Sequence, residues 1–265
     1  MSELDTDTAI EPVGEGRFRA SITDRWSIGS APNGGYLAMI AARAIAAVVP
    51  APDPFSVTTH FLAVARPGPA EVVTEIVRVG RGHSTAQAKL VQDGREVLRT
   101  IAVFGDLSAI EGPTALTIEP PKLPPSESCE RSRPAPSAAT ISDRVDMALA
   151  PGTSPWSTGA HDERGELRGW VRLRDGREPD SLSLVFFADA FPPPVLSFSA
   201  VRTPWVPTLE LTVHVRARPA PGMLRAWFRT RALIDGYLEE DGELWDASGK
   251  LVAMSRQLAR IHRAR

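Results

Sequence analysis

The chain contains two stretches that repeat the same order of patterns, one on each side of a proline-rich segment. In the first stretch, an apolar helix pattern at 34–49 precedes segments that alternate polar and apolar residues up to residue 105. In the second, an apolar pattern at 181–191 precedes similar alternating segments at 209–261. Repeats of this length, about 70 residues or more, indicate a duplicated domain rather than a solenoid of short units.

The alternating segments predict strands of antiparallel sheets. In 209–217, every second residue is apolar and the residues between them are polar or charged. The turns QDG and ASG, before the last strand of each repeat, supply glycines that tolerate positive φ angles. In the helix pattern at 36–49, Arg43 is the only charged residue, so this helix is expected to be buried around most of its circumference. One apolar helix and a long antiparallel meander in each repeat predict an α+β fold.

The segment between the repeats, 113–136, is expected to be an extended connector. Seven of its 24 residues are proline, and few large apolar side chains lie between them. We therefore expect an N-terminal domain at 1–112 and a C-terminal domain at 137–265. Cys129 falls in the connector and is expected to be an exposed, incidental thiol. As the chain's one cysteine, it excludes an intrachain disulfide and a cysteine-rich metal site.

Composition excludes some classes of function. The net charge is −2, and no long run of one sign suggests a basic face for nucleic acid. The N-terminal residues are acidic and polar, without the apolar core of a signal peptide. The longest apolar run, 36–50, contains Arg43 and is too short to span a membrane. A cytoplasmic protein is expected.

Asp189 and Gln257 are candidate site residues on physical grounds. Asp189 is the only charge in the apolar segment 181–191, where a carboxylate must be paired, solvated in a cleft or functional. It could instead cap a helix end, since prolines follow at 192–194. Gln257 lies at the apolar parity of its strand, where an amide needs hydrogen-bond partners, either at a site or within the core.

Other candidates leave two interpretations open. Simple alternation places Thr208 on the outward face, which a β-bulge after Pro207 would reverse, and Thr212 is the alternative threonine. Gly34 and Gly35 begin a helix, where they could admit a ligand to free N–H groups or allow close packing.

We find no metal-binding spacing, no GxSxG elbow and no phosphate-binding loop. His60 and His214 occupy equivalent strand positions without acidic partners in motif spacing, and we interpret them as structural. Arg66, Arg216 and Arg218 could meet phosphates or lie at solvated strand ends.

The order and spacing of five segments resemble a known family. APNGGYLAMIAARAI, VTTHFLAVARPGPAEV and VGRGHSTAQAKLVQDGREVLRTIAVF resemble the N-terminal hotdog domain of acyl-CoA thioesterase II-type proteins. The segments from FFADAF through TLELTVHVRARP to GKLVAMSRQLARI resemble their C-terminal hotdog domain. The resemblance implies a double hotdog, each unit a long helix wrapped by a curved sheet. Its subunits are expected to form a homo-oligomer.

The resemblance also implies hydrolysis of acyl-CoA, or of a similar acyl-carrier thioester, without metal, cofactor or covalent intermediate. It places the water-holding Asp, Thr and Gln at Asp189, Thr208 and Gln257. The first repeat has Asn33 at its helix start and no acid there, so one site per chain is expected. Two alternatives stay open: a hotdog hydratase or dehydratase, disfavoured because neither helix segment contains a histidine, and a non-catalytic acyl-thioester or lipid-binding protein.

Overall fold

The computed structural model describes residues 1–131, 140–153, 161–201 and 205–261. The last residues of the expected connector, 132–136, lie outside this part of the chain.

Within the described residues, fourteen strands form one antiparallel sheet and two short strands form another. The strands are β1 (Ile10–Gly14), β2 (Arg17–Ile22), β3 (Ser27–Ile28), β4 (Ala31–Pro32), β5 (Asp53–Phe61), β6 (Gly68–Val79), β7 (His83–Gln92), β8 (Arg95–Gly105), β9 (Glu130–Arg131), β10 (Val145–Leu149), β11 (Glu166–Leu173), β12 (Thr208–Val215), β13 (Leu224–Arg229), β14 (Leu233–Ile234), β15 (Tyr237–Trp245) and β16 (Leu251–Arg260). The α-helices are α1 (Glu3–Asp7), α2 (Gly34–Ala46) and α4 (Ser183–Phe187), and the 3-10 turns are η1 (Asp24–Trp26), η2 (Ser126–Ser128), η3 (Thr140–Asp143) and η4 (Pro194–Ser197).

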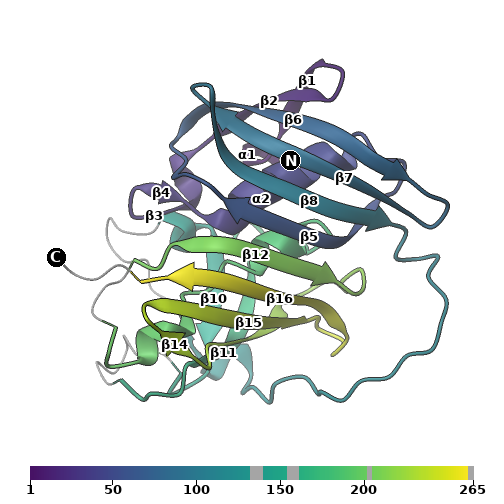
Figure 1. The fold of residues 1–265 in the computed structure, drawn as a ribbon. Coiled ribbons are helices and arrows are strands. Elements are labelled where there is room, and N and C mark those ends of the chain that lie inside the picture. Colours follow the sequence, from purple (N-terminus) through teal and green to yellow (C-terminus); the bar gives the residue numbers. More distant parts are fainter. Residues whose placement is uncertain (132–139, 154–160, 202–204, 262–265) are drawn as a thin grey trace.

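The two repeats are joined edge to edge through β5 and β12. The strand order is β1-β2-β6-β7-β8-β5-β12-β16-β15-β13-β11-β10-β9, with β14 beside β15. Strands of the first repeat therefore lie on one side of the β5–β12 seam and strands of the second on the other (Figure 1). The seam is a regular antiparallel ladder from Glu210 opposite His60 to His214 opposite Ser56. The structure therefore confirms the predicted α+β fold with an antiparallel sheet.

Helix α2 is buried as its sequence predicts. Asn33 caps its start, where the Asn33 side chain accepts a hydrogen bond from the Tyr36 N–H at 2.9 Å. Only Gly34, Arg43 and Ala46 of the helix are partly exposed. The helix packs against β5 to β8 and against α4, so it is the centre of a core shared by both repeats. Trp26 and Phe186 add an edge-to-face contact between the repeats, with ring centroids 5.2 Å apart.

Helix α4 is much shorter than the sequence predicted, and the expectation of a long helix in each repeat is wrong for the second. Asp180 caps its start, accepting from the Ser183 N–H at 2.7 Å. After Phe187 the chain continues in tighter turns, in which Asp189 N–H donates to the Phe186 carbonyl at 3.1 Å. Prolines at 192–194 prevent the helix from resuming.

Cys129 is buried, with 8% of its surface exposed, so the expected exposed thiol is wrong. Residues 126–131 of the connector do not remain extended in solvent: η2 turns the chain, and β9 then pairs with β10 at the edge of the described sheet. The Cys129 Sγ lies 3.8 Å from the Pro124 carbonyl oxygen, and burial raises the pKa of its thiol. The earlier part of the connector has little regular structure and loops away from the sheet (Figure 1).

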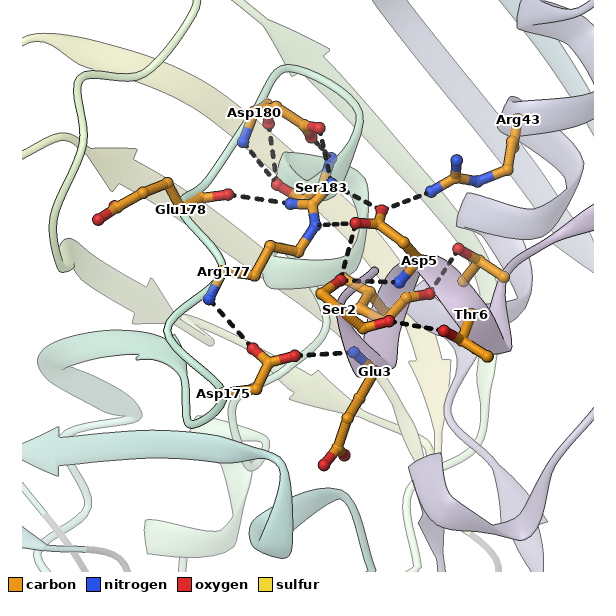
Figure 2. A network of polar contacts seen from close by, with 12 residues as sticks. Ser2, Glu3, Asp5, Thr6, Arg43, Asp175, Arg177, Glu178, Asp180 and Ser183 are labelled. Carbon is orange, nitrogen blue, oxygen red and sulfur yellow. Dashed lines mark hydrogen bonds and ion pairs between the residues drawn. The ribbon is translucent and has the colours of Figure 1, made fainter.

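A network of polar contacts fastens the N-terminal helix α1 to both repeats (Figure 2). Asp5 of α1 accepts hydrogen bonds at 3.0 Å from Arg43 of α2 and from Arg177, which precedes α4. Arg177 also donates to Asp180 at 2.7 Å. Burial alone would raise the pKa of Asp5, but hydrogen bonds from Arg177, Ser2 and Arg43 lower it to about 2. The carboxylate of Asp5 is therefore charged at neutral pH and links the two repeats.

A second ion pair ties the repeats at the far end of the seam. Arg218, after β12, donates to Asp53 at the start of β5 through Nε at 3.0 Å and Nη2 at 2.7 Å. Ser181 donates to the other oxygen of Asp53 at 2.7 Å. No helix in the described part of the chain is long and apolar enough to cross a bilayer.

Candidate active site

A cavity of about 300 Å³ lies where the two repeats meet. Its wall is mostly apolar, and five of its described lining residues carry polar or charged side chains: Asn33, Asp189, Thr208, Gln257 and Arg260. Asp189, Thr208 and Gln257, separated by up to 68 positions in the sequence (189 to 257), thus share one cavity with the start of α2. An apolar cleft with a few convergent polar groups is typical of a small-molecule site.

Asp189 lies against the N-terminus of α2 from the other repeat. Its Oδ2 accepts hydrogen bonds from the Gly35 N–H at 2.8 Å and from Asn33 Nδ2 at 2.9 Å. Asn33 Nδ2 also donates to the Asp189 backbone carbonyl at 2.8 Å. Asp189 therefore fits both interpretations, the helix cap and the site residue. Its carboxylate caps the helix of the other repeat, and it also lines the cavity.

The environment of Asp189 suits a proton acceptor. Burial raises its pKa to about 6, although hydrogen bonds from Gly35, Asn33 and Gly34 favour the charged form and limit the rise. A carboxylate with this pKa is mostly ionised at pH 7 and is more basic than an exposed aspartate.

Gly34 and Gly35 make the close approach of Asp189 possible. A Cβ on Gly35 would lie 2.8 Å from the Asp189 Cβ and 2.8 Å from the Phe186 carbonyl oxygen. A Cβ on Gly34 would lie 3.0 Å from Asp189 Oδ2 and 3.0 Å from Phe61 Cζ. Of the two glycines, Gly34 lines the cavity. Close packing explains both glycines, and Gly34 also leaves a ligand room to approach the helix end.

Thr208 and Gln257 form a pair on adjacent strands. The register of β12 against β16 shifts between Thr208 and Glu210, which is the bulge that reverses the alternation after Pro207. Thr208 Oγ1 donates to Gln257 Oε1 at 2.9 Å. Thr212, the alternative, hydrogen-bonds to Thr58 at 2.9 Å and does not line the cavity, so the structure brings Thr208 and not Thr212 to Gln257.

Glu240 lies directly behind this pair and was missed by the sequence reasoning. It is opposite Gln257 in the register of β15 and β16, and only 5% of its surface is exposed. Burial raises its pKa well above the ordinary value; the charge of Asp189 raises it further, and the Gln257 side chain counters the rise. The signal was present in the sequence, because Glu240 shares its parity with the apolar residues Leu238 and Leu244.

The remaining candidates lie elsewhere or have other partners. Arg218 is engaged with Asp53 at the end of β12 that is remote from Thr208. His60 and His214 are exposed and do not line the cavity. Arg260, which was not singled out from the sequence, lines the cavity and stacks over Tyr237, with its guanidinium 5.4 Å from the ring centroid. In the described part of the chain, no group of three or more His, Cys, Asp and Glu side chains could hold a metal ion.

Asn33 is the other residue of this site whose importance the sequence reasoning missed. It caps α2, binds Asp189 and lines the cavity. An asparagine directly before an apolar helix pattern is a helix-start signal, and the cap could have been predicted from it. Its second contact could not, because Asp189 is 156 residues away.

Family models match both halves of the chain. Residues 22–105 match the acyl-CoA thioesterase N-terminal domain, and residues 120–261 match the acyl-CoA thioesterase C-terminal domain. The chain therefore belongs to the acyl-CoA thioesterase family.

Individual relatives cover almost the whole chain. A Thermobifida fusca protein provisionally named a thioesterase II is 35% identical, with a TM-score of 0.92 over 99% of this chain and 100% of that structure. A hot dog fold protein of unknown function from Alicyclobacillus acidocaldarius is 25% identical, with a TM-score of 0.86 over the full length of both chains. The thioesterase-like protein TwmA of Talaromyces wortmannii is 25% identical, over 96% of this chain and 90% of its own length.

Proposed function

We propose that the protein hydrolyses acyl-CoA, or a similar acyl thioester, to a free carboxylic acid and a thiol at the cavity between its repeats. The observation that carries this proposal is the convergence on one cavity of a basic carboxylate, Asp189, and a hydrogen-bonded Thr208–Gln257 pair. These groups come from separate elements and have the donors and acceptors needed to hold one water molecule.

In this mechanism the water oxygen bonds to the thioester carbonyl carbon while Asp189 takes the water proton. Thr208 and Gln257 orient the water, and the Thr208–Gln257 hydrogen bond fixes both side chains. The carbon–sulfur bond then breaks, and the proton on Asp189 returns to the departing thiolate. A thiolate leaves readily, so positioning and charge stabilisation are the main requirements.

The start of α2 supports the negative charge that develops on the carbonyl oxygen. Gly34 lines the cavity at the positive end of the helix dipole. Because the Gly35 N–H and the Asn33 amide are bound to Asp189, they set the base in place rather than contact the carbonyl. The first repeat thus contributes to the site although it has no acid of its own.

The apolar wall suits an acyl group. Its larger side chains are Ile28, Leu37, Phe61, Phe191, Trp205 and Val206. Its volume of about 300 Å³ corresponds to roughly ten water molecules at ~30 Å³ each, which is room for a short to medium chain. Arg260, on the same wall, is a candidate contact for the phosphates of CoA.

The finer features of the fold belong to the same proposal. We assign a double hotdog, with an N-terminal unit at 1–112, a connector at 113–136 and a C-terminal unit at 137–265. The repeated element order and the matched family domains support it. A homo-oligomer is part of the proposal because hotdog sheets commonly pair edge to edge, which closes exposed edges; in the described sheet the outer strands are β1 and β9.

The direct test is thiol release from acyl-CoAs of graded chain length by wild type and the Asp189→Asn variant. Loss of a general base lowers kcat by about 10²- to 10⁴-fold, and we expect a loss of this size. Asp106→Asn changes a half-buried carboxylate directly after β8 that does not line the cavity; it is the matched control and should retain wild-type turnover. Wild-type turnover in a correctly folded Asp189→Asn protein excludes the proposed role of Asp189. Binding of acyl-CoA without any turnover by the wild type would identify a binding protein instead.

A further inference from the structure

We propose that Glu240 is a positioning residue of this site, which holds the Gln257 side chain from the side that faces away from the cavity. The proposal rests on the proposed function, because it assigns Glu240 a part in placing the water that Gln257 orients.

The register of the sheet gives the first observation. Glu240 on β15 is directly opposite Gln257 on β16, and directly opposed residues project from the same face of an antiparallel pair. Gln257 lines the cavity, and Glu240 is not among the described residues that do. Glu240 therefore stands behind Gln257, within reach of its amide but separated from the substrate.

The hydrogen bonds of Gln257 give the second observation. Its Oε1 accepts from Thr208 Oγ1, which leaves the Nε2 group to donate. Glu240 contacts Gln257 and supplies an acceptor for one N–H of the Gln257 Nε2 group. The other N–H can donate to the water in the cavity. With Thr208 and Glu240 both in contact, the Gln257 amide cannot rotate without losing a partner.

The burial of Glu240 gives the third observation. Within the described residues, Glu240 Oε2 and the hydroxyl of Thr230 are buried without a hydrogen-bond partner. Thr230 follows the last pair of β13 and β15, so it lies next to Glu240 in register. A buried carboxyl with an unpartnered oxygen is costly to a fold unless it is neutral or serves a site.

The charges around Glu240 determine when it ionises. Asp189 faces it from the segment after α4, and Asp241 is adjacent on its own strand. The groups that β16 and the end of β13 present to it, Gln257 and Thr230, are uncharged. Burial, and then the charge of Asp189, raise the pKa of Glu240 well above its ordinary value, so this environment favours the protonated form of Glu240. Ionisation of Glu240 as the pH rises places a negative charge behind the Gln257 amide, which alters how Gln257 holds the water and lowers the rate.

The experiment compares Glu240→Gln, Glu240→Leu and the control Asp241→Asn. Asp241 is the next residue on the strand, points to the opposite face and pairs with Arg256 and Arg231. In Glu240→Leu, we expect kcat to fall by about 10- to 100-fold with KM within about threefold of wild type, since Gln257 is misplaced but the cavity is intact. Glu240→Gln should retain kcat at pH 7 within about threefold, because it keeps a neutral hydrogen-bonding group.

The pH profile separates positioning from a structural role. Glu240→Gln should lose the alkaline limb of kcat and keep the acid limb set by Asp189, while Asp241→Asn should keep both. Unchanged kcat in Glu240→Leu, or an unchanged alkaline limb in Glu240→Gln, would overturn the proposal.

A spectroscopic measurement decides the question independently of turnover. The ¹⁵N side-chain amide signal of Gln257, assigned by its loss in Gln257→Ala, should shift when Glu240 ionises in wild type and in Asp241→Asn. In Glu240→Gln that shift should be absent. If the wild type hydrolyses no thioester but shows the shift, the proposed function fails and the Glu240–Gln257 link stands; absence of the shift in wild type removes the link.

Discussion

The two repeats have the same order of elements but unlike helices. In the first repeat, α2 runs from Gly34 to Ala46 and presents its capped N-terminus to the cavity. In the second, α4 ends at Phe187, and the turn after it delivers Asp189 to that N-terminus. The first repeat thus contributes hydrogen-bond donors and the positive helix end, and the second contributes the carboxylate and the Thr–Gln pair.

This difference shows how a duplicated fold can form a single site. The first repeat has an amide, Asn33, at the start of its helix, and the second has an acid, Asp189, just after the end of its helix. The two groups are hydrogen-bonded to each other, so neither repeat contains a complete arrangement. Variants that disturb this contact should therefore affect activity more than variants elsewhere in either repeat.

The largest effect should come from adding a methyl group between the repeats. In Gly35→Ala the new Cβ meets Asp189 and the Phe186 carbonyl at 2.8 Å, so the carboxylate must move. We expect kcat to fall by about 100-fold and the free energy of unfolding to fall by about 1–3 kcal/mol. Gly82→Ala is the control, since a Cβ there meets nothing within 4 Å. Equal kinetics for the two variants would show that the close approach is not needed.

The pH dependence should reflect the burial of Asp189 at this contact. With its pKa raised to about 6, kcat/KM should fall about tenfold per pH unit below pH 6 as the base becomes protonated. A stopped assay at pH 5, 6, 7 and 8 with one acyl-CoA measures this limb. An acid limb near pH 4 would show that Asp189 is solvated like an ordinary carboxylate.

The raised pKa of Asp189 also makes the stability of the protein depend on pH. Stability is favoured at low pH, whereas activity is favoured at neutral pH. A raised pKa means that the fold favours the neutral form. The contribution to stability is therefore full below pH 3.8 and is lost as the pH rises through about 6. Between these limits the wild type should lose up to about 3 kcal/mol relative to Asp189→Asn, at 1.36 kcal/mol per pKa unit. Denaturant unfolding of both proteins from pH 4 to pH 7 measures this difference.

The smallest effect on activity should come from the polar network of Figure 2, whose labelled residues do not line the cavity. Arg177→Met removes two hydrogen bonds to Asp5 and should cost about 1–2 kcal/mol of stability, with kcat changed less than about threefold. Because the pKa of Asp5 is lowered to about 2, its stabilising effect is present above pH 3.8 and lost as the pH falls through about 2. The deficit should therefore shrink in acid.

Arg19→Met provides the comparison within one repeat. Arg19 pairs with Glu11 on the neighbouring strand, and both side chains are more than 60% exposed, so its removal should cost less than about 1 kcal/mol. A larger loss for Arg19→Met than for Arg177→Met would show that the network does not link the repeats.

Local patterns in the sequence predicted most of the shared architecture. Helix α2 is buried on nearly all sides and the strands after it are buried on one face. Burial determines which residues are apolar, so both patterns can be recognised in the local sequence. Strand β2 could also have been predicted, since Phe18, Ala20 and Ile22 alternate with polar residues. Strand β10 could not be predicted by alternation, because every residue from Val145 to Leu149 is buried.

The site was predictable only where a residue conflicts with its local surroundings. Asp189 and Gln257 interrupt apolar patterns, and so does Glu240, which the same test would have found. The burial of Cys129 and the contact between Asn33 and Asp189 depend on residues distant in the sequence, so no local pattern predicts them. The sequence indicated that a bulge after Pro207 would be needed to turn Thr208 inward. Whether the bulge forms depends on how β12 pairs with β16, which the sequence alone does not give.

The seam between β5 and β12 determines how molecules can reach the cavity and leave it. Its backbone ladder runs through five successive residue pairs, and separating the repeats would break these hydrogen bonds together. We therefore do not expect the two repeats to move apart about a hinge in each reaction cycle. Residues 62–65 and 205–207 contribute side chains to the cavity wall, and on the proposed function we expect changes in these two short segments to alter the rate of product release.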